Sequence, residues 1–104
     1  MSANPAPTRE QVIDALHDVL DPEIGYNIVD IGLIYEVSLD DGHLALRMTM
    51  TTPGCPAQDY IQRGVRERSL AVPGIDSVDI HLVWEPRWSV QKMSPEAKAH
   101  VGIA

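Results

Sequence analysis

This chain of 104 residues is poor in cysteine, phenylalanine and basic residues: it has one cysteine, no phenylalanine, and eight Lys and Arg against fifteen Asp and Glu. A single cysteine excludes an internal disulfide and any zinc or cluster site built only of cysteines from one chain. The formal net charge of −7 argues against a nucleic-acid partner, because phosphates are bound by basic surfaces. Without phenylalanine, the core must consist mainly of Leu, Ile, Val, Met and the two tryptophans.

Long apolar runs are also missing, and none approaches the roughly 20 residues needed to cross a membrane. Residues 1–8 are polar and proline-rich, so we expect a disordered lead there and no signal peptide. We expect residues 9–104 to form one domain. The lone free thiol suits a reducing compartment, so we predict a cytoplasmic location.

The first half of the chain shows helical and then strand periodicity. Thr8 and Gln11 form a capping-box pattern ahead of apolar residues at helical spacing, which predicts a helix over 9–20. From residue 29 the apolar period changes to two, which predicts a strand over 29–37. Gly32 within this strand indicates a bulge or the close approach of another backbone.

A hairpin turn at 40–42 should lead into a second strand that buries its even-numbered residues and exposes its odd-numbered ones. The predicted inward set is Leu44, Leu46, Met48 and Met50, and the predicted outward set is Ala45, Arg47, Thr49 and Thr51. A helix should then begin at Pro56, because proline suits the first helical position. It should end near Val72-Pro73-Gly74.

The last part of the chain predicts a third strand over 77–85, with Trp84 facing inward. Trp88 should fold back over the core or onto a second subunit, because its large apolar ring is costly to expose. Ser94 and Pro95 mark the start of a short C-terminal helix. The fold class is therefore α+β: a two-layer helix-strand-strand-helix-strand domain with a three-stranded sheet and a short C-terminal helix. Three strands leave exposed edges, so we expect a homodimer or a covering tail.

Cys55 stands in the stretch that connects the second strand to the helix after it. This position predicts a thiol at or next to the helix N-cap, where unpaired N–H groups and the helix dipole favour a thiolate. Thr51 and Thr52 place two hydroxyl groups close to it in the sequence. The alternative is an ordinary strand-turn-helix corner with an inert cysteine.

Two carboxylates, Asp21 and Glu23, occupy the turn-rich loop that follows the first helix. They could line a site or bind a cation, or Asp21 could serve only the turn while Glu23 stays in solvent. We predict that the loop at 21–25 lies near the turn at 52–55. The four histidines are scattered and lack the spacing of metal ligands.

Six motifs together resemble the metal-sulfur cluster biosynthesis family, which includes SufT-like and PaaD-like proteins. They stand at 21–23, 29–35, 51–56, 72–75, 84–88 and 93–94 and cover almost the whole chain. The resemblance implies a fold similar to the C-terminal domain of NifU. It also implies that the family's motif cysteine, loop acids and threonines correspond to Cys55, to Asp21 and Glu23, and to Thr51 and Thr52. The cysteine-rich C-terminal segment of PaaD-like proteins has no counterpart in this sequence.

The resemblance implies an iron–sulfur cluster assembly or maturation factor that is not an enzyme. Cys55 would act as a transient ligand or contact for iron or a cluster, with no cofactor stably bound. The expected partners are an iron–sulfur scaffold, a carrier or apo client proteins. The alternatives are a thiol-dependent enzyme with Cys55 as nucleophile, a PaaD-like factor for a ring-hydroxylating oxygenase complex, and an interaction module in which Cys55 is structural and Trp88 lies on the binding face.

Overall fold

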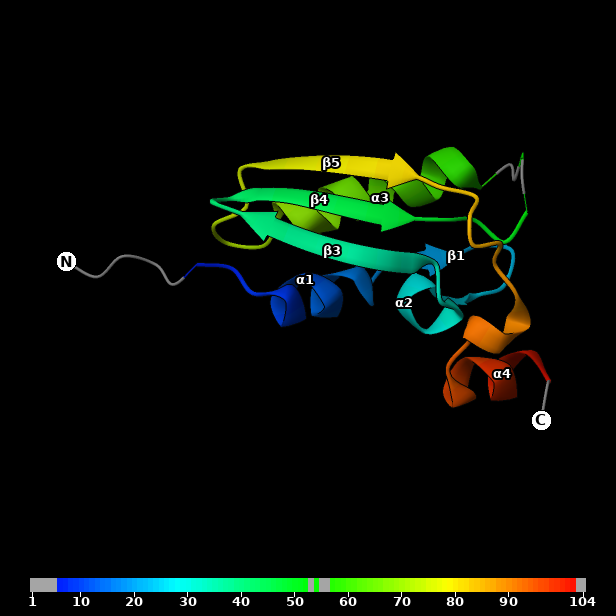
Figure 1. The fold of residues 1–104 in the computed structure, drawn as a ribbon. Helices are drawn as coiled ribbons and strands as arrows, with labels where there is room; N and C mark the ends of the chain where they lie inside the picture. The colour runs from blue at the N-terminus through cyan, green and yellow to red at the C-terminus, as the bar shows by residue number, and fades with distance from the viewer. Residues whose placement is uncertain (1–5, 53, 55–56, 103–104) are drawn as a thin grey trace.

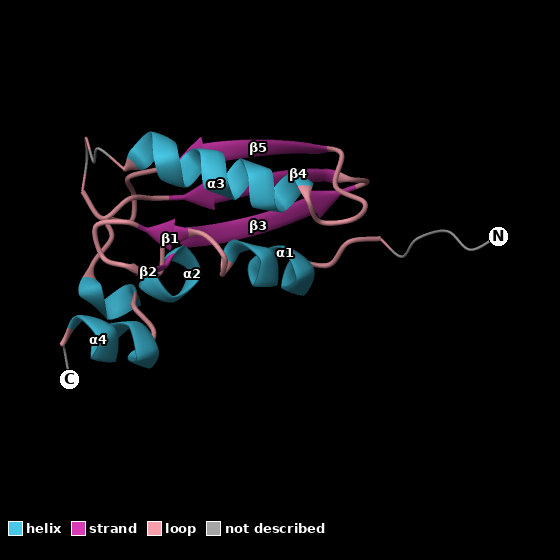
Figure 2. Cartoon of the chain, turned by 180° about the vertical axis from the view of Figure 1, so that it is seen from behind, coloured by secondary structure: helices cyan, strands magenta, loops and turns pink. Residues whose placement is uncertain are grey.

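A three-stranded sheet forms one layer of the molecule, and two helices form the other. The computed structural model describes residues 6–52, 54 and 57–102. The strands β3 (Ile34–Asp40), β4 (His43–Met48) and β5 (Ser77–Leu82) lie in the order β3-β4-β5. β3 pairs with β4 in the antiparallel sense, and β4 runs parallel to β5. The helices α1 (Arg9–Leu16) and α3 (Gln58–Leu70) cover one face of the sheet (Figures 1 and 2), which confirms the predicted α+β class.

The helix α1 begins as predicted but ends earlier. The Thr8 hydroxyl accepts a hydrogen bond from the Gln11 amide at 3.1 Å, and the Gln11 side chain accepts one from the Thr8 amide at 2.9 Å. The predicted extension to residue 20 is wrong, because Leu20–Asp21 forms the short strand β1. This strand pairs antiparallel with β2 (Tyr26–Asn27). Tertiary pairing therefore overrides the helical spacing at the end of the first predicted helix.

The predicted strand over 29–37 is wrong in its first half, where the chain forms the short helix α2 (Ile28–Ile31). The Asn27 side chain accepts a hydrogen bond from the Asp30 amide at 2.9 Å and caps this helix. Gly32 ends it with φ 91°, a left-handed conformation that glycine adopts without a Cβ penalty. The two caps fix a helical turn in which Ile28 and Ile31 are both buried, so the apolar alternation there does not indicate a strand.

Gly32 also meets another backbone closely, as predicted. An added Cβ would lie 2.5 Å from the Lys92 carbonyl oxygen. The approaching chain is residues 83–94, here called the C-terminal strap, which runs from β5 back to α2 (Figure 1). It is tied down where Trp88 Nε1 donates to the Ile31 carbonyl at 2.8 Å and where the Ser94 amide donates to the Asp30 carbonyl at 2.7 Å. The prediction that Trp88 folds back over the core is confirmed.

The strand faces follow the prediction with two exceptions. All four predicted inward residues of the second strand are buried, and the hairpin turns through Asp41 (φ 49°) and Gly42 (φ 85°). Thr49, predicted to face outward, is 0% exposed. Trp84, predicted to face inward, is 40% exposed, because β5 ends at Leu82 and the chain leaves the sheet there. Alternation fails at both places because each lies just past a strand end.

The helix α3 begins at Gln58 rather than at Pro56, and Ala57 is its N-cap residue. Gly64 allows the close packing predicted for it, since an added Cβ would lie 3.2 Å from a Val19 methyl group. A 3-10 turn over Val90–Lys92 leads to the helix α4 (Pro95–Val101), which Ser94 caps as predicted. Among the described helices, none has the length and apolar character needed to span a membrane.

Candidate functional site

A hollow of about 420 Å³ opens where β4 ends, between the chain after β4 and the C-terminal strap. Thr51 and Thr52 line it from one side, and Thr52 is exposed while Thr51 is half-buried. The described residues that complete its lining are Met50, Trp84, Glu85, Arg87 and Trp88. Two of the five predicted site residues therefore border an open hollow at the end of the sheet.

The two tryptophans at this hollow have different roles. Trp88 is half-buried, and its ring nitrogen is bound to the Ile31 carbonyl, so it anchors the strap. Trp84 is 40% exposed and presents an apolar ring to solvent. Glu85 and Arg87 are also exposed beside it and carry opposite charges. A large exposed aromatic residue next to charged groups is typical of a protein-docking surface.

Tyr35 supports the strap beside this hollow. Its hydroxyl donates to the Pro86 carbonyl at 2.7 Å, and Lys92 Nζ lies 5.0 Å from its ring centroid. Burial raises the pKa of Tyr35, with the Glu85 carboxylate acting in the same direction and the Thr49 hydroxyl opposing it. The Thr49 hydroxyl has no hydrogen-bond partner among the described residues, so burial is the main cause of the raised pKa.

In the loop at 21–25, the Asp21 carboxylate holds a turn. Asp21 is 1% exposed, and its Oδ1 accepts a hydrogen bond from the Glu23 amide at 2.9 Å. The Asp21 carbonyl accepts another from the Gly25 amide at 2.7 Å. The carboxylate bond is one by which aspartate stabilises a tight turn, and the main-chain bond closes the same turn. Glu23 itself is exposed.

This loop borders the start of α3. Leu20, which precedes Asp21, lines a groove together with Tyr60 from the first turn of that helix. Cys55 lies outside the described residues, so the predicted grouping of the carboxylates with the thiol stays a prediction. Because the N-cap is Ala57, Cys55 stands two residues ahead of the N-cap in the sequence, and not at or next to it.

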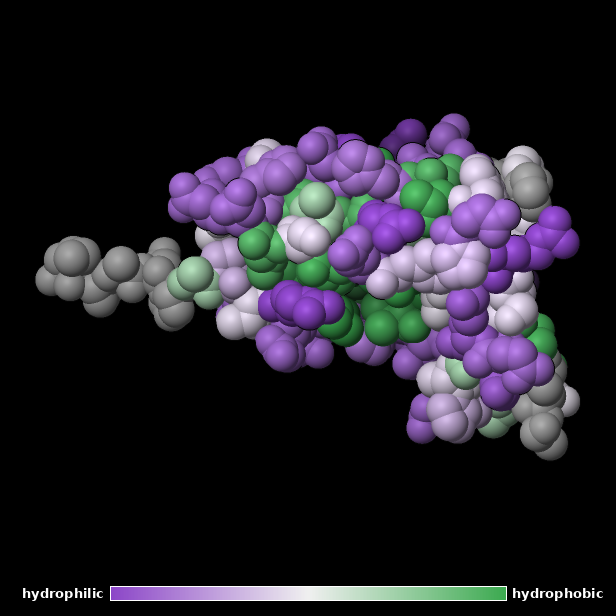
Figure 3. Space-filling view, in the orientation of Figure 1, coloured by the Kyte–Doolittle hydropathy of each residue, from purple (hydrophilic) through white to green (hydrophobic). Residues whose placement is uncertain are grey.

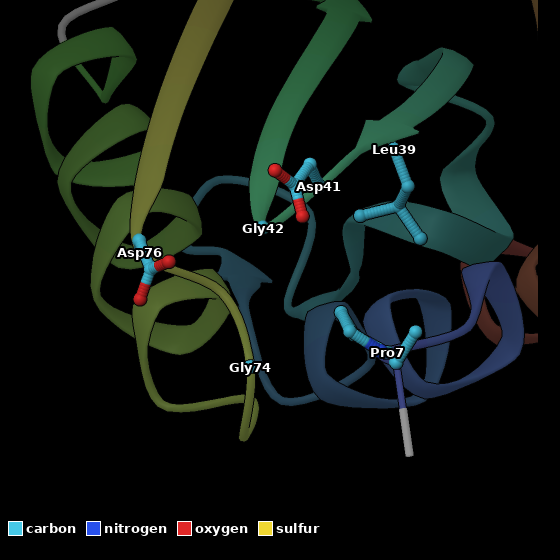
Figure 4. A pocket seen from close by; sticks show the side chains of 7 residues that line it. Pro7, Leu39, Asp41, Gly42, Gly74 and Asp76 are labelled. Carbon is cyan, nitrogen blue, oxygen red and sulfur yellow. The ribbon is translucent and has the colours of Figure 1, made fainter. Parts of the chain in front are cut away.

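A second hollow of about 420 Å³ lies at the opposite end of the sheet, beside the β3–β4 turn. Figure 4 shows Asp41 and Asp76 there, with Pro7 entering from the start of α1. Since β4 begins at this end and reaches the threonines only after its last residue, the acidic pair is separate from the candidate site.

The sequence alone indicates no functional role for Trp84, Glu85, Arg87 or Tyr35. The sequence predicts Trp84 in the core, and the run at 84–88 enters the sequence analysis only as a family motif and through Trp88, which one alternative places on a binding face. Two tryptophans and two charged residues directly after a strand could have indicated an exposed rim. What the sequence could not show is that the strap returns across the end of the sheet to meet the threonines.

Comparison with known proteins identifies the family. The family described as "Iron-sulfur cluster assembly protein" matches residues 9–82. The Fe-S protein maturation auxiliary factor YitW of Bacillus subtilis is 40% identical over 96 residues, which cover 91% of this chain and 94% of that protein. The factor SufT of Staphylococcus aureus is 38% identical over 87 residues, covering 83% and 99%.

A solved structure supports the same assignment. The crystal structure of a domain of unknown function from Bacillus anthracis has a TM-score of 0.86 and 37% identity, and the match covers 91% of this chain and 92% of that one. The resemblance read from the six motifs is thereby confirmed. The chain belongs to the iron–sulfur cluster assembly protein family.

Proposed function

We propose that this protein is an auxiliary factor in the maturation of iron–sulfur proteins, and that it works as a carrier or adaptor and not as an enzyme. The observation that carries the proposal is the match to maturation auxiliary factors along nearly their whole length. The chain and these relatives are of similar size, so the proposal needs no further domain from the relatives.

We place the contact with iron or with a cluster at Cys55. Thiolates are the ligands that iron–sulfur clusters use, and a cluster normally needs four. The single cysteine of this chain cannot hold a cluster alone, so a scaffold, carrier or apo client would supply the other ligands. This requirement favours a transient contact over a resident cofactor.

The hollow beside Thr51 and Thr52 suits such a role. The ring of Trp84 gives a partner an apolar anchor, while Glu85 and Arg87 give it oppositely charged contacts. We assign Thr51 and Thr52 to shaping the approach to the thiol. Asp21 is assigned to holding the loop that carries Glu23, because its carboxylate already accepts the Glu23 amide.

A thiol enzyme with Cys55 as nucleophile is less supported, because a nucleophilic cysteine is usually activated by a neighbouring base. None of the described residues that line the hollow is a histidine. His43 is engaged by Ser77 and Asp79 at the far end of the sheet, and His17 contacts the Ile13 carbonyl.

Anaerobic reconstitution tests the proposal directly. The wild type and Cys55→Ser would be incubated with ferrous iron, sulfide and an excess of a small thiol, which supplies the ligands that a partner protein would otherwise contribute, and then desalted and analysed for both elements. We expect the wild type to retain labile iron and sulfide that a chelator removes, and Cys55→Ser to retain much less. Equal retention by the two proteins would remove Cys55 from the metal contact, and turnover of a thioester by the wild type would favour the enzyme.

A further inference from the structure

The strand β5 leaves one edge of the sheet open. Within the described part of the chain it pairs only with β4. The Val83 amide donates to the Met48 carbonyl at 2.8 Å, so the odd-numbered residues of this strand direct their backbone groups toward β4. Because these directions alternate along a strand, the N–H and C=O groups of Val78, Ile80 and Leu82 face outward. Such a row can accept another strand.

The two edges of the sheet are protected differently. The edge at β3 has a bulge between Ile34 and Glu36. Bulges are a common means of blocking an edge. At β5, one side chain of the described residues is bonded to an outward backbone group, where Arg66 Nη1 donates to the Val78 carbonyl at 2.9 Å. A carbonyl oxygen has two lone pairs, so this contact still leaves room for a strand amide.

When two β5 strands are paired antiparallel with their Ile80 residues opposite each other, the facing residues of the two copies are complementary. Asp79 then lies opposite His81 of a second copy, and His81 lies opposite Asp79 of that copy. In the same register Val78 faces Leu82, and Ile80 faces its own equivalent. A two-fold interface requires this reciprocity: if one residue contacts a second residue of the other copy, that second residue contacts the first one in return. Asp79 and His81 fall at the non-hydrogen-bonded pairs, where side chains come closest.

The side chains along this edge fit that pairing. The Asp79 carboxylate is held by His43, whose Nε2 lies 3.1 Å from Asp79 Oδ2, and His81 is exposed on the same face of the sheet. Polar side chains follow β5 along the margin of the molecule in Figure 3. Ile80 and Leu82 point toward the core yet remain half-buried, and the equivalent residues of a second copy would cover them.

We propose that the protein forms a two-fold dimer through antiparallel pairing of the β5 strands. The result is a continuous six-stranded sheet in which α3 of each copy lies behind the joined edges. This inference depends on the open edge and on the Asp79–His81 complementarity, and it is independent of the role assigned to Cys55.

The dimer also determines where its two functional sites lie. Trp84 follows β5 at the end of the sheet that carries the hollow, and antiparallel pairing sends the two hollows to opposite ends. With about 3.3 Å per residue, the two Trp84 Cα atoms are separated by roughly 25 Å. Each hollow therefore stays open to a scaffold or client in the dimer.

Sedimentation equilibrium tests the interface with two opposite changes at one exposed position. His81→Asp places like charges opposite each other and should raise the dimer dissociation constant by about threefold to tenfold, because the pair occurs twice per dimer. His81→Lys should lower the dissociation constant, because it places a lysine opposite Asp79. The controls Ser38→Asp and Ser38→Lys repeat these charge changes at an exposed site on β3. We expect neither control to alter the dimer dissociation constant.

The geometry is tested by spin labels on Glu85→Cys in a Cys55→Ser background. Pairing through β5 predicts a label separation of roughly 30 Å. A short separation would show that the hollow ends meet instead and would overturn the proposal. So would a wild type that stays monomeric at millimolar concentration, or a dimer that responds equally to changes at His81 and at Ser38.

Discussion

At the scale of single residues, we expect one tryptophan of the C-terminal strap, Trp88, to contribute to stability and the other, Trp84, to contribute to function. Trp88→Phe removes the bond to the Ile31 carbonyl and should lower the free energy of unfolding by about 1–2 kcal/mol, because that buried acceptor loses its partner. Trp84→Ala removes an exposed ring and should change the free energy of unfolding by no more than about 0.5 kcal/mol. Urea unfolding of both variants measures this difference.

For function we expect the opposite order of effects, with the larger loss in Trp84→Ala and the smaller one in Trp88→Phe. We expect Trp84→Ala to impair the maturation of iron–sulfur enzymes in cells, because it removes the apolar anchor of the hollow. Trp88→Phe should retain function wherever it remains folded. If Trp84→Ala is fully active and as stable as the wild type, the exposed ring has no role in docking.

Tyr35 makes a pH-dependent contribution to stability. Burial and Glu85 raise its pKa, so the folded protein holds the phenol proton more tightly than the unfolded chain does. This contribution is complete below the ordinary tyrosine pKa of about 10 and is lost as pH rises through the folded-state value. The stability advantage of the wild type over Tyr35→Phe should therefore shrink in alkaline solution.

The measurement is urea unfolding from neutral to alkaline pH. Tyr60→Phe serves as the control, because Tyr60 is 61% exposed at the surface. An advantage over Tyr35→Phe that stays constant or grows with pH would contradict the direction of the shift.

At the scale of elements, Gly32 and Gly102 have nearly the same backbone conformation, with φ 91° and φ 87°. Gly102 has no described atom within 4 Å of an added Cβ, whereas Gly32 meets the Lys92 carbonyl oxygen at 2.5 Å. Alanine at Gly102 should cost about 1–2 kcal/mol of left-handed strain. Alanine at Gly32 should cost clearly more, because the C-terminal strap must also move.

Thermal or urea unfolding of both alanine variants gives this comparison, and the difference between them isolates the strap contact from backbone strain. Equal destabilisation would show that the strap yields to the added methyl group at no cost. In that case the strap would not be firmly held against α2.

The elements that local chemistry determines were predictable from the sequence. The capping box at Thr8, the Asp-Gly hairpin, the buried face of β4 and the Ser-Pro start of α4 all depend on contacts within a few residues. The helix α2 was missed because its Asn27 cap and Gly32 stop were outweighed by apolar alternation. Burial of Thr49 was not predicted because it depends on distant chain, where the Thr49 amide donates to the Leu33 carbonyl past the end of β4.

The candidate site was predictable in part for the same reason. Thr51, Thr52, Asp21 and Glu23 could be singled out because motif and turn chemistry are local. The rim formed by Trp84, Glu85 and Arg87 depends on where the strap crosses the end of the sheet. That crossing is set by long-range contacts such as Tyr35 to Pro86 and Trp88 to Ile31.

At the scale of the whole molecule, the strap and the open edge divide the protein into two regions. The strap end carries the threonines and the exposed tryptophan, and there we place the exchange of iron or of a cluster with partner proteins. The edge at β5 lies to the side of this region, so self-association and partner docking do not compete for the same surface. A dimer would then present two independent sites.

The central claim is that the thiol of Cys55 is required for the maturation of iron–sulfur enzymes. The most direct test is the activity of an aconitase-type cluster enzyme in cells that lack this gene and express either the wild type or Cys55→Ser at equal abundance. A further variant, Cys55→Ser with Ser38→Cys, keeps one cysteine but moves it to an exposed position on β3. The account predicts that only the wild type restores activity, and full restoration by Cys55→Ser would contradict it.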